Sequence, residues 1–136
     1  MKQSAGESLY RAVWAPYTGF ESDGRDIKKE GTPMRFFVKA QMDVEAANDL
    51  ARQGKLGSTI QSILEELKPE AAYFVADEGM RTAYLIVDLQ DASQIPALAE
   101  PWFLAFNASF EAQPAMVAED LAKAGPDIER AVKKYG

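Results

Sequence analysis

Residues 71–88 of the chain have the sequence AAYFVADEGMRTAYLIVD, and this stretch decides the fold class. Residues 71–76 and 82–88 are rich in aromatic and β-branched side chains, which favour strands. The segment between them, DEGMR, contains a glycine and has the length of a hairpin loop. The stretch therefore predicts two antiparallel strands joined by a hairpin.

A further strand is predicted on each side of this hairpin. Residues 34–41 alternate in direction, with Phe36, Val38 and Ala40 on one side, and residues 108–113 alternate in the same way. Helices are predicted between the strands, so the element order is β-α-β-β-α-β followed by a C-terminal helix. That order is the ferredoxin-like motif, an α+β fold in which the helices cover one face of an antiparallel sheet.

Capping residues and prolines set the predicted helix boundaries. The first helix follows Asp43 and runs to about Gln53, and the second begins at a capping box of Ser58 and Gln61 and ends before Pro69. The third is capped by Asp91 or Ser93 and closed by Pro101. A short helical turn at 119–124 is separated by Gly125-Pro126 from a last helix at 128–135.

Residues 1–33 differ from the rest of the chain. They hold five basic and five acidic residues, so the whole net charge of −6 belongs to residues 34–136, the predicted ferredoxin-like domain. They also lack a sustained helical or strand period. Two interpretations stay open: a poorly ordered extension, with Met34 as the true start, or an arm that docks through its apolar residues.

Composition excludes several classes of function. The chain has no cysteine and no histidine, which removes disulfides, zinc-thiolate sites, histidine-ligated haem and the usual general base, so we expect no metal and no cofactor. A net charge of −6 argues against a nucleic-acid partner. The apolar runs, such as residues 102–106, are too short for a membrane, and no secretory signal is expected, which together favour a cytoplasmic protein.

The alternation also predicts which side chains lie on each face of the sheet. Five of the eight residues on the face without helices are apolar or aromatic, whereas a solvated face is mostly polar. A second copy of the chain would cover this face, which predicts a homodimer; alternatively, the tyrosines simply lie on an open sheet. The helix-covered set is Phe36, Val38, Ala40, Phe74, Leu85, Val87, Phe110 and Ala112, and the opposite set is Phe37, Lys39, Tyr73, Val75, Tyr84, Ile86, Glu111 and Gln113.

Four charged residues are candidates for catalysis. With the strand order 4-1-3-2, Lys39 and Glu111 lie on neighbouring strands and point the same way. Beneath a dimer, Glu111 could act as a base and Lys39 could hold an anion, or the two could form a structural ion pair that fixes the register. Arg81 at the hairpin and Asp88 at the end of its second strand could contact a ligand, or could be plain surface charges.

Trp102, Phe103 and Phe106 form the densest aromatic group in the chain. They anchor either the core or the dimer, or else they form the wall of an apolar pocket. In the second interpretation Trp102, Phe106, Tyr73 and Tyr84 line a ligand pocket, and Asn107 supplies a hydrogen bond.

Five segments carry a resemblance to a known group: PEAAYF (69–74), RTAYLIVD (81–88), DASQIP (91–96), AEPWFLAFNA (99–108) and MVAEDLAKAG (116–125). They resemble a family of small bacterial proteins of the dimeric α+β barrel type, and the resemblance covers residues 34–136. In topology this group is similar to muconolactone isomerase and the antibiotic-synthesis monooxygenases. The resemblance implies a cofactor-free protein with a pocket for a small molecule.

Three functions follow as hypotheses. The first is a dimeric protein that binds a small apolar or anionic organic molecule. The second is a cofactor-independent isomerase, cyclase or monooxygenase, in which Glu111 or Asp88 moves a proton and Lys39 or Arg81 holds the substrate. The third is a structural or interaction protein that uses residues 1–33 as its docking arm.

Overall fold

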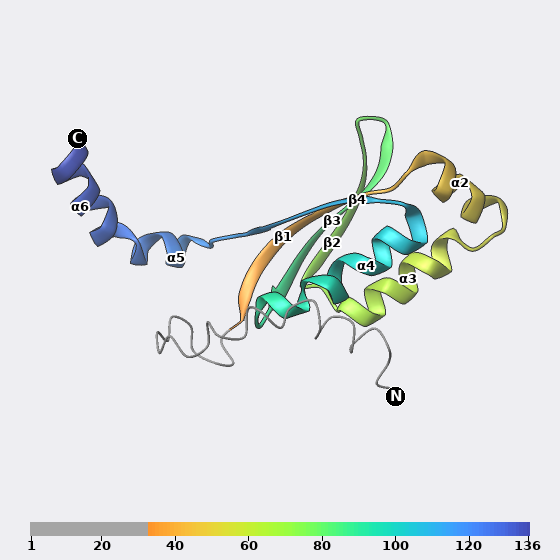
Figure 1. The fold of residues 1–136 in the computed structure, drawn as a ribbon, viewed down its shortest axis with the longest axis horizontal. Coiled ribbons are helices and arrows are strands. Elements are labelled where there is room, and N and C mark those ends of the chain that lie inside the picture. Colours follow the sequence, from red (N-terminus) through yellow and green to blue (C-terminus); the bar gives the residue numbers. More distant parts are fainter. Residues whose placement is uncertain (1–32) are drawn as a thin grey trace, which may run out of the picture. The chain divides into compact units, whose positions relative to one another are not determined.

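The computed structural model describes residues 33–136, and the two interpretations of the N-terminal extension lie outside the described residues. The secondary-structure elements follow the order that the sequence predicts (Figure 1). They are β1 (Met34–Gln41), α2 (Val44–Arg52), α3 (Leu56–Leu67), β2 (Ala71–Asp77), β3 (Met80–Leu89), a short 3₁₀ helix (Ala92–Gln94), α4 (Ile95–Phe106), β4 (Ser109–Pro114), α5 (Ala118–Lys123) and α6 (Gly125–Tyr135).

The four strands form one open antiparallel sheet with the order β2-β3-β1-β4. β1 therefore lies between β3 and β4, as the sequence predicts. Helices α2, α3 and α4 each place apolar side chains against one face of this sheet. The α+β class with an antiparallel sheet is confirmed.

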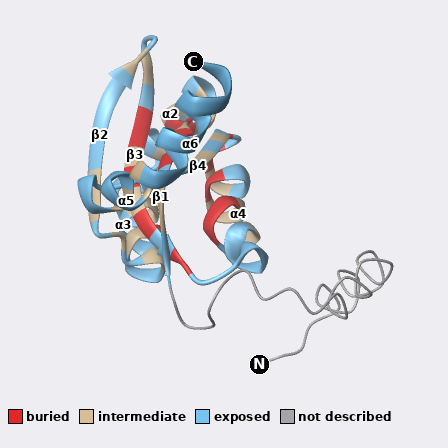
Figure 2. Cartoon of the chain, turned by 90° about the vertical axis from the view of Figure 1, so that its left-hand side faces the viewer, coloured by how far each residue is buried: buried red, intermediate tan, exposed pale blue. Residues whose placement is uncertain are grey.

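The core lies between that face and the helices, and Figure 2 shows its buried residues in red along β3 and α4. Phe74 lies on the helical side as expected, because its register partner Ala83 is in the core, but it is exposed and not covered by a helix. β2 is an edge strand, so Phe74 has a neighbouring strand on one side only. Fully or nearly fully buried are Val38, Ala40, Met42, Ala47, Ile63, Ala83, Leu85, Val87, Leu98, Trp102 and Phe106.

Three helix boundaries differ from the prediction. α6 begins at Gly125, so the expected break at Gly125-Pro126 lies in its first turn, where a proline is tolerated. α4 does not end at Pro101 but continues through it to Phe106, although a proline cannot donate the usual helical hydrogen bond. Burial of Trp102 and Phe106 in the core, which requires the helix to continue, outweighs this loss. α3 begins at Leu56, so Ser58 lies inside the helix and its hydroxyl donates to the Lys55 carbonyl at 3.2 Å.

The hairpin is tighter than the sequence suggests. The strands extend to Asp77 and Met80, and only Glu78 and Gly79 remain in the turn. Both turn residues have positive φ, 56° and 77°, which is the conformation of a two-residue type I′ turn. The tight turn keeps Asp77 in the sheet, where its side chain shares a face with Tyr84.

Candidate functional site

Three polar side chains meet on the face of the sheet that the helices leave open. The Lys39 ammonium lies 3.1 Å from Oδ2 of Asp77, and the Tyr84 hydroxyl donates a hydrogen bond to the same oxygen. Lys39 and Tyr84 are direct partners in the register of β1 and β3. The Asp77 carboxylate therefore joins an ammonium and a phenol, which we call the Lys39–Asp77–Tyr84 cluster.

Each pKa in this cluster is displaced by its neighbours. The hydrogen bond to Asp77 raises the pKa of Tyr84, and loss of solvent around the phenol adds to the effect. Hydrogen bonds from Tyr84 and then Lys39 lower the pKa of Asp77, and the hydrogen bond to Asp77 raises the pKa of Lys39. At neutral pH the cluster consists of a charged ammonium, a charged carboxylate and a neutral phenol.

A hollow of about 240 Å³ lies beside the cluster. Phe37 and Tyr84 stack with ring centroids 5.6 Å apart, and give the hollow an aromatic wall. Ligand pockets usually measure 300–1,000 Å³ and bury most of their ligand, so this open hollow has the size of a partial site. Its lining residues are Phe37, Lys39, Tyr84, Glu111 and Gln113.

Glu111 has no partner for its carboxylate among the described residues. It is exposed and lies directly opposite Lys39 in the register of β1 and β4, as the sequence predicts. The ion pair of Lys39 is made with Asp77 instead. Sequence reasoning missed Asp77 because it assigned this residue to a five-residue loop. Gly79, which readily adopts the positive φ of a two-residue turn, is the signal that could have kept Asp77 in the strand, although glutamate is not a usual residue at the first turn position.

The predicted pocket of Trp102, Phe106, Tyr73 and Tyr84 is not formed within one chain. Trp102 and Phe106 are fully buried in the core, on the side of the sheet that the helices cover. Tyr73 and Tyr84 are register partners on the opposite side. The sheet separates the two pairs, and of these four residues only Tyr84 lines the hollow.

Asn107, Arg81 and Asp88 also lie away from the hollow. Asn107 ends α4 in the left-handed conformation, with φ 49°, which asparagine tolerates better than most residues. Arg81 donates to Oδ1 of Asn48 at 2.9 Å and so ties the hairpin to α2. Asp88 is exposed opposite Arg35, whose guanidinium pairs with Glu70 at 3.1 Å.

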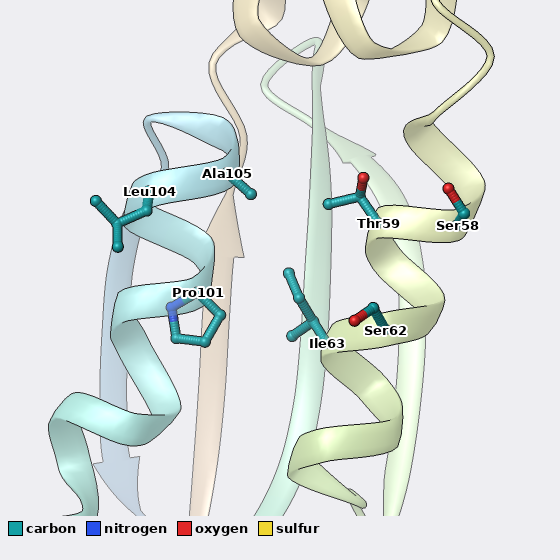
Figure 3. A pocket seen from close by; sticks show the side chains of 7 residues that line it. All are labelled: Ser58, Thr59, Ser62, Ile63, Pro101, Leu104 and Ala105. Carbon is teal, nitrogen blue, oxygen red and sulfur yellow. The ribbon is translucent and has the colours of Figure 1, made fainter. Parts of the chain in front are cut away.

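A second hollow, of about 490 Å³, lies on the helical side between α3 and α4 (Figure 3). We call it the α3–α4 groove. One wall comes from α4, where Leu104 is 79% exposed, and the other comes from α3. Its lining residues are Ser58, Thr59, Ser62, Ile63, Pro101, Leu104 and Ala105.

The described residues define a small α+β domain with one open sheet face. Residues 34–128 match the family described as a domain of unknown function, DUF3303, and the chain belongs to this family. Neither the curated proteins nor the solved structures contain a match to the chain. Within residues 33–136 no helix combines the length and the apolar character that crossing a membrane requires, and no three acidic side chains gather as a metal ion would need.

The Lys39–Asp77–Tyr84 cluster predicts a late-ionising tyrosine. The ionisation of Tyr84 is measured by subtracting the ultraviolet titration curve of Tyr84→Phe from that of the wild type. We expect the midpoint of this difference curve to lie above the ordinary tyrosine pKa of about 10, because ionised Tyr84 would face the Asp77 carboxylate. Asp77→Asn should lower this midpoint. A wild-type midpoint at or below about 10 would contradict the cluster.

The same shifts set the sign of the pH dependence of stability. Tyr84 and Lys39 have a higher pKa in the folded state than in the unfolded state. Each therefore stabilises the fold fully at a pH below its unfolded-state pKa, and this stabilisation is lost as the pH rises through its folded-state pKa. Asp77 has a lower pKa in the folded state than in the unfolded state. It stabilises the fold at a pH above its unfolded-state pKa, and this stabilisation is lost as the pH falls through its folded-state pKa.

Proposed function

We propose that this protein is a homodimer that binds a small organic anion between its sheets. Two ferredoxin-like subunits would pair through their open faces and form a dimeric α+β barrel. The observation that carries the proposal is the hollow beside the Lys39–Asp77–Tyr84 cluster, which lies on a face with exposed aromatic side chains. The absence of cysteine fits a cytoplasmic location for this dimer.

Exposure of large apolar side chains supports the pairing of subunits. Phe37, Tyr73 and Val75 all lie on the open face, and Tyr73 is 66% exposed. An apolar face of this kind on a soluble domain usually marks an interaction surface. A second copy would cover these residues and would also close the hollow, which on one subunit is smaller than a usual ligand pocket.

The residues around the hollow indicate the class of ligand. The aromatic wall of Phe37 and Tyr84 favours a ring or another flat apolar group. Lys39 supplies a positive charge that a carboxylate could share with Asp77. Asp77 and Glu111 both carry negative charge beside Lys39, so the site tolerates one carboxylate at most, and Glu111 would accept a hydrogen bond from a hydroxyl or an amine. The best fit is a small aromatic molecule with a single carboxylate.

Catalysis is the second candidate, and the position of Glu111 favours it. Glu111 is an unpaired carboxylate opposite Lys39, and neutral Tyr84 lies on the other side of the same lysine. A carboxylate base and a phenol acid beside one bound anion could move a proton without any cofactor. The reaction class would be a cofactor-independent isomerase, cyclase or monooxygenase, and Glu111→Gln would lower turnover by about 10²-fold to 10⁴-fold without weakening anion binding.

Calorimetric titration with benzoate, the simplest aromatic carboxylate, tests the binding site. We expect Lys39→Met to weaken benzoate binding by about 10-fold to 100-fold, because a charge-assisted hydrogen bond contributes about 1.5–3 kcal/mol. Lys55→Met is the matched control, since Lys55 is exposed at the start of α3, and this variant should bind as the wild type does.

Native mass spectrometry of protein purified without denaturant provides the second measurement. We expect the mass of a dimer, with any co-purified small molecule as an added mass. Equal loss of benzoate binding in both lysine variants would contradict the site. A dimer that binds neither benzoate nor a co-purified molecule would favour the structural or interaction protein over both ligand hypotheses.

A further inference from the structure

The C-terminal arm, which consists of α5 and α6, has an apolar stripe that the described chain does not cover. Neither helix contains a buried residue. Ile128, Val132 and Tyr135 recur at the spacing of one helix face, and they are 51%, 61% and 78% exposed. An α6 of 11 residues is too short to be stable alone in water, so it needs a surface on which to pack.

The base of the arm is fixed to the sheet. The Ala115 N–H donates to the Arg35 carbonyl at 2.9 Å, just after β4 ends at Pro114. From there the chain continues in the direction of β4, away from α3 and α4 of its own subunit (Figure 1). This exit favours packing of α6 on another molecule.

The α3–α4 groove has the form that an amphipathic helix fills. Two neighbouring helices form its walls, and an apolar helix face commonly lies in such a groove. Leu104 lies at the outer edge of the α4 wall and points away from α3, and it is the most exposed large apolar side chain of the described residues, while Ile63 belongs to the core beneath (Figure 3). Burial of Leu104 against Ile128 and Val132 would remove apolar surface from water on both sides.

Charge also matches the arm to the body of the chain. Residues 33–117 hold twelve acidic and six basic residues, whereas residues 118–136 hold four of each. Arg130 forms an ion pair with Asp127 in the same helix, and Lys133 and Lys134 follow Glu129, the last acidic residue of the arm. The end of α6 is therefore positive, and the body that it would contact carries the negative charge.

Acidic residues continue the groove beyond its lining. Glu66 lies one helical turn after Ser62, and Glu100 precedes Pro101. Neither carboxylate has an ion pair within the described part of the chain. α3 and α4 both contact the sheet and each other, so these two acids are fixed near the same end of the groove. The basic residues at the end of α6 would form ion pairs with these two carboxylates.

We propose that α6 of one copy of this chain lies in the α3–α4 groove of a second copy. The proposal rests on the homodimer of the proposed function, and it makes the exchange of arms reciprocal by twofold symmetry. Each subunit would then contribute its open sheet face and its arm to the other.

The chain has no cysteine, so engineered cysteines report this contact directly. After subunit exchange, an equimolar mixture of full-length Ser62→Cys and Val132→Cys is oxidised mildly and analysed on a non-reducing gel. We expect a disulfide-linked dimer. The control replaces Val132→Cys with Lys133→Cys, which lies about 100° away around α6, and its cross-linking should be at least 10-fold slower.

The possible results separate this proposal from the proposed homodimer. A disulfide that forms only within the Ser62→Cys/Val132→Cys double variant would show that the arm folds onto its own subunit, and would overturn the exchange. Failure to cross-link in a protein that sediments as a dimer would overturn the exchange and leave the homodimer intact. Sedimentation as a monomer would reject the homodimer and the exchange together.

Limited trypsin digestion keeps the proposal testable if a cysteine variant fails to fold. A docked α6 protects the bonds after Lys123 and Arg130. Leu104→Arg places a charge in the groove without touching the core, because Leu104 is exposed. We expect this variant to lose its arm to trypsin at least 10-fold faster than the wild type. An unchanged rate of cleavage would overturn the exchange.

Discussion

Replacement of Trp102 by alanine is expected to lower the free energy of unfolding by about 3–5 kcal/mol. Trp102 is 0% exposed, and its ring stacks on Phe106 with centroids 6.0 Å apart. Removing the indole would leave a cavity between α4 and the sheet that neighbouring side chains fill only in part. Urea unfolding monitored by circular dichroism measures the change.

Two further variants on α4 are the controls for this prediction. Ala97→Ser, at an exposed position of the same helix outside the groove lining, should change stability by less than about 1 kcal/mol. Trp102→Phe should cost less than Trp102→Ala, because the phenyl ring fills much of the space and because the indole Nε1 makes no hydrogen bond to residues 33–136. Equal stability of the Trp102→Ala variant and the wild type would exclude burial of this residue.

The second large effect is expected at the open face of the sheet. Phe37→Glu places a carboxylate where two sheets would meet, and it should weaken the homodimer by about 100-fold or more. An unpaired charge in a buried interface costs several kcal/mol, and about 2.8 kcal/mol corresponds to a 100-fold change in Kd. Sedimentation equilibrium over a range of protein concentrations measures the constant.

The matched control for this prediction is Val44→Glu. Val44 is as exposed as Phe37, but it lies in the first turn of α2, in the helical layer. This variant should associate as the wild type does. If Phe37→Glu and Val44→Glu give the same Kd as the wild type, the open face is not the dimer interface.

Most of the fold can be predicted from local patterns. Strand alternation placed Lys39 and Glu111 on one face, and the register confirms this position. Pro101 shows where local rules fail, because tertiary burial of Trp102 and Phe106 carries α4 past a residue that usually ends a helix. A boundary that depends on burial cannot be predicted from the capping pattern alone.

The candidate site was harder to predict, because it depends on one turn. The length of the hairpin loop decides whether Asp77 lies in the loop or in the sheet. Because Glu78 and Gly79 both adopt positive φ, they form a two-residue turn by themselves, and Asp77 remains in β2. The structure does not bring Trp102 and Tyr73 together within one chain, and the sequence could not show this for another reason. Aromatic composition does not show on which side of a sheet each ring lies, and these two lie on opposite sides.

The edge strand β2 has a consequence for the solution behaviour of the subunit. Residues 71–76, AAYFVA, contain no charge and no proline, and one side of their backbone has no neighbouring strand. Uncharged segments of this kind on an open edge are templates for intermolecular β-aggregation. Glu70 and Asp77 flank the segment and are held by Arg35 and Lys39, so these carboxylates act as gatekeepers against fibril growth.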